Sequence, residues 1–130
     1  MGLTKLPPIY IPEIKEEHIT DYGNVSNDFN PLHFDKKAAK QAGFPTIIAH
    51  GMMTMGISTK LISPWLSKDY IISEYESSFR QPLLVGDSLH LVGKMIKQKE
   101  TYARISFEGV NQANQTIITG KIWVNSILTE

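Results

Sequence analysis

The segment from residue 51 to residue 66 restricts the fold more than any other part of the sequence. Its large apolar residues point in nearly every direction around a helix: Met52, Met53, Met55, Ile57, Leu61, Ile62 and Leu66. A helix that is apolar on most of its sides is buried within a protein. Gly51, Gly56 and Ser58 are small enough to allow close approach of other backbone, and Pro64 marks the expected end. The sequence therefore predicts a central buried helix around which the rest of the chain must wrap.

From Tyr70 onward the apolar residues alternate with a period of two, which is typical of β-strands. We expect strands at about 70–80, 88–98, 101–112 and 116–127, with turn residues such as Pro82 and the pair Gly86–Asp87 between them. The connections are short, so we expect these strands to be antiparallel neighbours. The predicted fold class is α+β, with a curved antiparallel sheet wrapped around the central buried helix.

The first half of the chain is predicted to be mainly helical. Residues 9–11 suit a short first strand, and a helix is expected near 13–25, with Pro12 at its start and acidic residues in its first turn. A crowded polar turn follows and ends at Pro31. Asp35 is the expected N-cap of a short helix over 36–42, which Gly43 would close in a left-handed conformation.

Composition excludes several classes of function. A chain of 130 residues suggests one domain, over 1–130. Lys+Arg and Asp+Glu are both 13, so the net charge is zero and gives no electrostatic footprint for nucleic acid or an anionic membrane. No cysteine is present, which removes disulfides, thiolate nucleophiles and Cys-based metal sites and fits a reducing compartment. The sequence lacks a visible export signal or membrane span, so we expect the cytoplasm.

Three polar residues stand out in turn-like or apolar surroundings: Asp28, His33 and His50. Taken one at a time, each has an ordinary structural explanation. Asp28 can cap its own turn, and His33 can be a half-buried histidine with satisfied hydrogen bonds. Asn30 followed by Pro31 favours a tight turn, which would bring Asp28 and His33 together across five residues. A carboxylate and an imidazole placed together can hold a water molecule and move its proton.

The linked motifs around these residues resemble a known family. D-F-N-P-L-H at 28–33, A-G-F at 42–44 and I-A-H-G-M at 48–52 are similar to the MaoC-type hydratases and dehydratases, which are single hot-dog proteins. Phe79, Pro82 and Gly86–Asp87 continue the resemblance with an F-x-x-P-x-x-x-G-D pattern. The resemblance covers roughly residues 18–125, and the segment A-H-G-M-M-T-M-G looks especially like short (3R)-hydroxyacyl-ACP dehydratase subunits.

The resemblance implies the hot-dog fold and the reversible hydration of trans-2-enoyl thioesters to (3R)-3-hydroxyacyl thioesters, carried by CoA or ACP. It implies that Asp28 and His33 form a catalytic dyad and that the backbone N–H of Gly51 binds the thioester carbonyl. An unpaired N–H at a helix start suits the charge that develops on that oxygen. We also expect His50 and Asn30 at the substrate site, where His50 orients the loop and Asn30 braces the turn.

The resemblance further implies a dimer, which we expect to be a homodimer, with a heterodimer as the alternative. We expect no cofactor. Many family members have a serine about two turns into the central helix. The matching residue is Thr59, with Ser58 beside it, and either hydroxyl is open to that role. The dimer also agrees with physical reasoning, because one curved sheet around one helix leaves an edge strand and an apolar flank exposed.

Other chemistries fit the sequence less well. A metal site built from Asp28, His33 and His50 would need the turn to fold back, so we expect no metal. A Gly-rich phosphate loop after a strand is missing, which argues against a nucleotide cofactor. A thioesterase on the same fold would need an acid in the central helix, and residues 51–63 contain neither Asp nor Glu. A non-catalytic acyl-thioester-binding subunit would be expected to lose the dyad, which this chain keeps.

Overall fold

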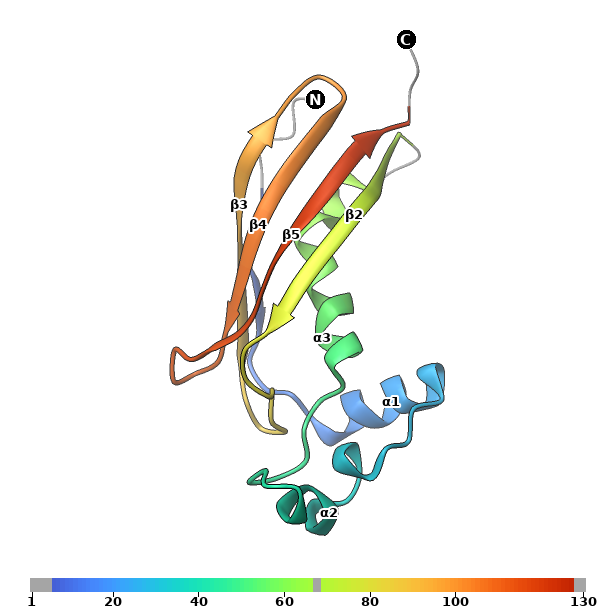
Figure 1. Ribbon diagram of the computed structural model, residues 1–130, viewed down its shortest axis with the longest axis vertical. Helices are drawn as coiled ribbons and strands as arrows, with labels where there is room; N and C mark the ends of the chain where they lie inside the picture. Colours follow the sequence, from blue (N-terminus) through green and yellow to red (C-terminus); the bar gives the residue numbers. More distant parts are fainter. Residues whose placement is uncertain (1–5, 67–68, 128–130) are drawn as a thin grey trace.

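A computed structural model describes residues 6–66 and 69–127 of the chain. One short strand near the N-terminus and four long strands from the second half form a five-stranded antiparallel sheet with the strand order β1-β3-β4-β5-β2 (Figure 1). The strands are β1 (Ile9–Ile11), β2 (Tyr70–Phe79), β3 (Leu89–Gln98), β4 (Tyr102–Val110) and β5 (Thr116–Ser126). The predicted α+β class, the curved antiparallel sheet and the approximate strand bounds are therefore confirmed.

One predicted neighbour relation is wrong. β2 pairs with β5 and β3 pairs with β4 and β1, so β2 and β3 lie on opposite sides of the sheet and are not neighbours. The connection over 80–88 crosses the end of the sheet, where Ile48 forms a bridge to Leu84. Buried Asp87 fixes this connection, since its carboxylate accepts hydrogen bonds from the Leu84 N–H at 2.9 Å and from Gln112 at 2.8 Å. The length of the connection did not reveal this crossing, because the contacts that fix it involve residues distant in the sequence.

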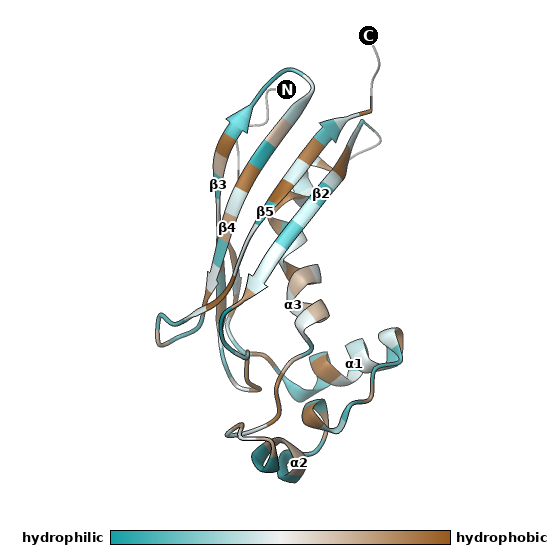
Figure 2. Ribbon diagram, viewed as in Figure 1, coloured by the Kyte–Doolittle hydropathy of each residue, from teal (hydrophilic) through white to brown (hydrophobic). Residues whose placement is uncertain are grey.

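The central helix lies along the inner face of the sheet (Figure 1). It consists of α3 (Gly51–Ser58) followed by a 3-10 helix, η2 (Thr59–Trp65), so Pro64 lies inside the last turn and not beyond it. The Ser58 hydroxyl donates to the Met55 carbonyl at 2.6 Å, and such bonds to residue i−3 accompany the tighter turn. The helix contributes Met53, Leu61, Ile62 and Trp65 to the core shared with the sheet, whose strands alternate in hydropathy (Figure 2).

Burial of this helix on nearly every side was expected, and this part of the prediction is wrong. Met52 is 63% exposed, and Gly51 and Gly56 are also exposed. The single sheet covers one side of the helix, while the two other α-helices lie at its N-terminal end (Figure 1). One flank of α3 is therefore uncovered in the isolated chain.

The two remaining α-helices are α1 (Glu16–Ser26) and α2 (Lys36–Gln41). α1 begins three residues later than expected, because both backbone groups of Ile14 are already bonded at 2.7 Å to the Gly86–Asp87 turn. The caps of α2 agree with the prediction: Asp35 accepts from the N–H groups of the first turn, and Gly43 has a φ of +97°. In the part of the chain that the structure describes, each helix is too short or too polar to cross a membrane.

Candidate active site

The loop that follows α1 carries the first predicted site residues. Asn27 ends α1 in the left-handed conformation with a φ of 59°. The Asp28 carboxylate then accepts the Asn30 N–H at 3.2 Å, and the Asn30 side chain accepts the Leu32 N–H at 3.1 Å. This second bond caps the 3-10 helix η1 (Pro31–His33). The predicted tight turn is therefore present, and the Asn30 side chain braces it.

The ring of half-buried His33 is held by the chain segment that precedes α3. Its Nδ1 lies 2.8 Å from the carbonyl oxygen of Ile48, and the Ile48 N–H bonds in turn to the Leu32 carbonyl at 3.2 Å. A carbonyl can only accept, so Nδ1 is the donor. In the neutral ring, Nε2 then carries the lone pair. The Ile48 carbonyl thus sets the tautomer of His33, which the sequence could not indicate.

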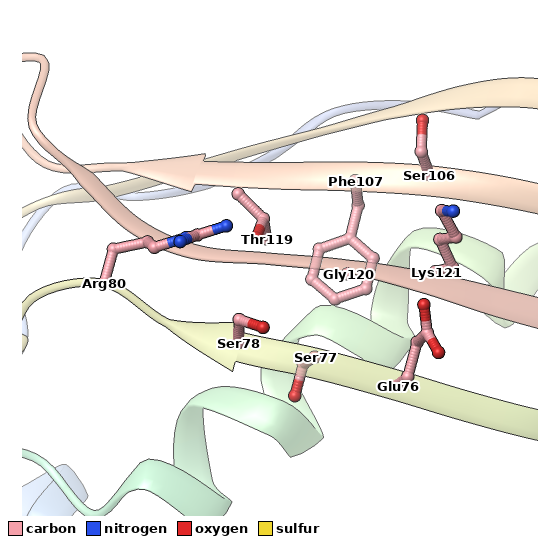
Figure 3. Close-up of a pocket in the computed structure, with 9 residues that line it drawn as sticks. All are labelled: Glu76, Ser77, Ser78, Arg80, Ser106, Phe107, Thr119, Gly120 and Lys121. Atoms are coloured by element: carbon pink, nitrogen blue, oxygen red, sulfur yellow. The ribbon is translucent and has the colours of Figure 1, made fainter.

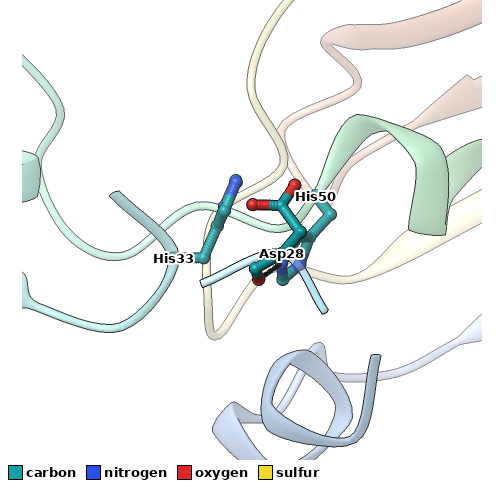
Figure 4. A group of neighbouring side chains, drawn as sticks. All are labelled: Asp28, His33 and His50. Atoms are coloured by element: carbon teal, nitrogen blue, oxygen red, sulfur yellow. Dashed lines mark hydrogen bonds between the residues drawn. The ribbon is translucent and has the colours of Figure 1, made fainter. Parts of the chain in front are cut away.

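The three polar residues singled out in the sequence meet at one place. Asp28, His33 and His50 each present a ligand-capable atom, and these atoms lie within 4.8 Å of one another (Figure 4). The rings of His33 and His50 are stacked, with centroids 3.8 Å apart and an angle of 22° between their planes. The Asp28 carboxylate is exposed, whereas His50 is only 2% exposed. The cluster is therefore open to solvent on the Asp28 side and closed on the His50 side.

His50 lies behind the other two residues. Its Nε2 donates to the backbone carbonyl of Asp28 at 3.0 Å, drawn as a dashed line in Figure 4. Its ring also contacts Tyr22 at a centroid distance of 4.9 Å, and Phe34 lies at 5.8 Å. His50 Nδ1 is buried and has no hydrogen-bond partner among the described residues. These contacts favour an orienting role for His50 over direct contact with a ligand.

Gly51 is the first residue of α3, as predicted, and it is exposed. Within residues 6–66 and 69–127 its N–H makes no hydrogen bond, as expected for the first residue of a helix. A Cβ at this position would lie 3.2 Å from the ring tip of Phe79. The glycine therefore leaves space between the start of the helix and the ring of Phe79, the first residue of the F-x-x-P motif.

Ser58 and Thr59 were the two candidates for the hydroxyl on the central helix. Ser58 is fully buried, and since its own proton goes to the Met55 carbonyl, it accepts from the Tyr75 hydroxyl at 2.7 Å. Thr59 Oγ1 donates to the Gly56 carbonyl at 2.7 Å. Both hydroxyls therefore already make hydrogen bonds, to carbonyls of the helix and, for Ser58, to Tyr75 of β2. The Ser58–Tyr75 bond joins residues from separate elements and was not predicted.

The same three side chains are the described group that could hold a metal ion. Their geometry fits a shared ion poorly. Stacked imidazoles present their faces to each other, whereas metal ligation needs their in-plane lone pairs to converge. His33 Nδ1 and His50 Nε2 are also engaged by backbone carbonyls. The arrangement suits proton transfer better than metal binding.

Two hollows in the described surface are lined by residues other than those of the cluster. The first, of about 550 Å³, is lined by Glu76, Arg80 and Lys121 among others from β2, β4 and β5 (Figure 3). The second, of about 510 Å³, lies between α1 and α3 and includes Tyr22 and Met53. Neither is lined by Asp28, His33 or Gly51. The first hollow lies on the sheet, whereas the second adjoins the cluster, since Tyr22 contacts the His50 ring and the Met53 N–H bonds to the His50 carbonyl.

Comparisons with known proteins agree with the sequence motifs. A family model described as "MaoC like domain" matches residues 6–117. The chain is 35% identical over 85 residues to a mitochondrial 3-hydroxyacyl-[acyl-carrier-protein] dehydratase of Arabidopsis thaliana, covering 65% of this chain and 51% of that protein. It is 26% identical over 106 residues to the (R)-specific enoyl-CoA hydratase of Aeromonas caviae, covering 79% of each. The chain spans about half to two thirds of the length of the first curated relatives it matches.

The fold has close counterparts among solved structures. The unliganded R-hydratase from Pseudomonas aeruginosa superposes with a TM-score of 0.82 at 23% sequence identity, over 98% of this chain and 89% of that one. At this identity the likeness concerns the fold. The hot-dog arrangement expected from the sequence is therefore confirmed.

Proposed function

Since the chain belongs to the MaoC-like domain family, we propose that it catalyses the reversible hydration of trans-2-enoyl thioesters to (3R)-3-hydroxyacyl thioesters. The observation that carries this proposal is the proximity of Asp28 and His33, whose polar side-chain atoms lie within 4.8 Å of each other on the solvent-facing side of buried His50. The names of the hydratase and dehydratase relatives support the same reaction.

In the proposed reaction the dyad handles one water molecule. The water oxygen bonds to C3 of the enoyl thioester, one proton leaves that water, and one proton is added at C2. His33 suits this exchange, because its Nδ1–H bond to the Ile48 carbonyl leaves the Nε2 lone pair available. The Asp28 carboxylate is exposed beside it and offers a second acceptor for the same water. Together the pair takes a proton from water and returns one to carbon.

We assign stabilisation of the thioester oxygen to the backbone N–H of Gly51. Attack at C3 moves negative charge onto this oxygen, and a fixed donor that faces it lowers the barrier. Gly51 offers an exposed N–H at the positive end of α3, directly after His50. One donor of this kind is worth about 3 kcal/mol in other enzymes.

We propose that the working form is a homodimer. β2 is a ten-residue strand at the edge of the sheet. β2 itself carries exposed Phe79 (50%) and Ile71 (47%), and Met52 of α3 is 63% exposed. An open edge next to apolar surface favours association with another chain. Light scattering of the purified protein alone should give twice the 14.6 kDa chain mass, and a mass of one chain would contradict this part of the proposal.

The carrier of the acyl group is either CoA or ACP in this proposal, and the cytoplasm stays the predicted location. The acyl-carrier-protein dehydratase of Arabidopsis thaliana is named as mitochondrial, which concerns that relative only. Kinetics with matched CoA and ACP thioesters of the same acyl chain measure the carrier preference directly.

The test of the function is the loss of enoyl absorbance with crotonyl-CoA and with longer trans-2-enoyl-CoA substrates. We expect activity in the wild type and a loss of about 10²–10⁴-fold in Asp28→Asn and in His33→Ala. Asp21→Asn and His90→Ala are matched controls, because both residues are exposed and belong to α1 and β3, outside the site. An inactive wild type on all chain lengths and both carriers, or full activity in both dyad variants, would contradict the proposal.

A further inference from the structure

His50 touches each part of the proposed catalytic machinery without facing the solvent. Its Nε2–H binds the Asp28 carbonyl, its ring is stacked on His33, and it is the N-cap residue of α3, directly before Gly51. It is 2% exposed, so a substrate that reaches the dyad has little access to it. These contacts connect three segments of the chain through one side chain.

The hydrogen bond from His50 fixes the main chain of Asp28. The two residues are 22 positions apart in the sequence, and the bond is 3.0 Å long. Asp28 lies in an exposed loop just after the end of α1, where its other hydrogen bonds among the described residues are local: its N–H donates to the Ser26 hydroxyl, and its carboxylate accepts from the Asn30 N–H. The bond to the buried His50 therefore joins the acidic half of the dyad to the start of the central helix.

The face of the His50 ring supports the other half of the dyad. His33 is held at its edge by the Ile48 carbonyl and on its face by His50, with centroids 3.8 Å apart. Tyr22 of α1 and Phe34 also contact the His50 ring, and these contacts restrict its movement. Edge and face contacts together restrict rotation of the His33 ring, so that it keeps its place beside Asp28.

His50 is poorly placed to exchange a proton itself. Its donated Nε2–H leaves the lone pair of the neutral ring at Nδ1. That atom is buried and has no partner among the described residues. A proton donor or acceptor in catalysis needs a route to water or substrate, which the buried Nδ1 lacks.

We propose that His50 is a positioning residue, which holds Asp28, His33 and the Gly51 N–H in one fixed arrangement through its Nε2–H bond and its ring face. The proposal rests on the proposed hydratase function for its kinetic consequence. A misplacement of about 1 Å in a catalytic group can cost about 10²-fold in rate. Loss of the His50 contacts should therefore reduce kcat while KM changes little.

Two substitutions separate the contacts of His50. His50→Phe keeps a ring face against His33 and removes the donor to Asp28, and we expect kcat to fall by about 10–100-fold with KM within about threefold. His50→Gln places an amide N–H near the position of Nε2 but removes the ring face against His33, so we expect it to recover part of kcat. His90→Phe is the matched control, since His90 is an exposed histidine on β3. All variants are assayed well below their unfolding temperatures.

The kinetic outcomes decide the proposal in a wild type that is active. A normal kcat in His50→Phe overturns the role of the Nε2–H bond, and a fully normal kcat in His50→Gln overturns the role of the ring face. A raised KM at unchanged kcat also overturns the proposal, because that result indicates direct contact with the substrate. A merely structural role would lower the unfolding temperature of His50→Phe without this split between kcat and KM.

Nitrogen NMR of the histidine rings tests the positioning independently of any activity. At a pH where the rings are neutral, the structure predicts the Nε2–H tautomer for His50 and the Nδ1–H tautomer for His33. The His50→Phe variant should shift the backbone amide signals of the loop around Asp28, and His50→Gln should shift them much less. The Nδ1–H tautomer at His50, or an unchanged loop in His50→Phe, would overturn the proposal even if the wild type proved inactive on thioesters.

Discussion

A proline at position 51 removes the proposed oxyanion donor with little change to the helix that presents it. Gly51 is the first residue of α3, a position where proline is favoured because its missing N–H is unpaired within the helix anyway. The preceding residue, His50, has φ −62° and ψ 135°, in the extended region that a residue before proline adopts. The backbone on both sides is therefore compatible with Gly51→Pro.

Two effects of Gly51→Pro must be separated: the lost N–H and the added side-chain carbons. Removal of one oxyanion donor costs about 3–4 kcal/mol, or about 10²–10³-fold in kcat. An added Cβ meets the ring tip of Phe79 at 3.2 Å, and Phe79 is 50% exposed, so its ring can move by a few tenths of an ångström. Gly51→Ala adds this Cβ and keeps the N–H, and we expect it to change kcat by less than about threefold, which is below 1 kcal/mol.

The assay is steady-state hydration of crotonyl-CoA by the wild type, Gly51→Ala and Gly51→Pro, with folding checked by circular dichroism. We expect Gly51→Pro to be about 10²-fold slower in kcat than Gly51→Ala. Equal rates for the proline and alanine variants, both folded, would refute the assignment of the Gly51 N–H as donor. An equally large loss in both variants would assign the effect to the Phe79 contact instead.

The remaining predictions concern stability, metal dependence and the turn at Asp87. Gly120→Ala should destabilise the protein by about 3 kcal/mol in urea unfolding, because the added Cβ would clash with the Glu76 carbonyl oxygen and the Phe107 ring. Gly93→Ala is the control: the atom nearest to its Cβ is 3.6 Å away, so the free energy of unfolding should change by less than about 1 kcal/mol. Asp87→Ala should cost about 1–3 kcal/mol in the same experiment, since it removes the acceptor of the partly buried Leu84 N–H and of the Gln112 amide. Prolonged treatment with EDTA should leave hydratase activity unchanged, and restoration of a lost activity by Zn²⁺ would contradict the proton-transfer role of the cluster.

The sequence predicted those features that depend on local periodicity and turn chemistry. Apolar alternation after Tyr70 indicated the four long strands, and Asp35 and Gly43 indicated the ends of α2. Asn30 followed by Pro31 indicated the turn that brings Asp28 near His33. Each of these signals acts over a few residues, so it can be read without knowledge of the tertiary structure.

Features that depend on distant contacts were missed or wrong. The separation of β2 from β3 and the later start of α1 both follow from bonds to the turn around Gly86–Asp87, from elements far apart in the sequence. The exposed flank of α3 reflects how much surface one sheet can cover, which apolar composition alone overestimates. The contacts of His33 with the Ile48 carbonyl and the His50 ring likewise arise only when the loops meet.

The most direct test of the central claim follows the oxygen of water into the product. Crotonyl-CoA incubated with the wild-type protein in water enriched in heavy oxygen should give the (3R)-3-hydroxybutyryl thioester, still attached to CoA, with the label on the C3 hydroxyl. Mass spectrometry of the intact thioester and a chiral separation of the hydroxy acid measure both features. Release of free CoA with the label in a carboxylate would indicate thioester hydrolysis, and that result, or the absence of labelled product, would contradict the account.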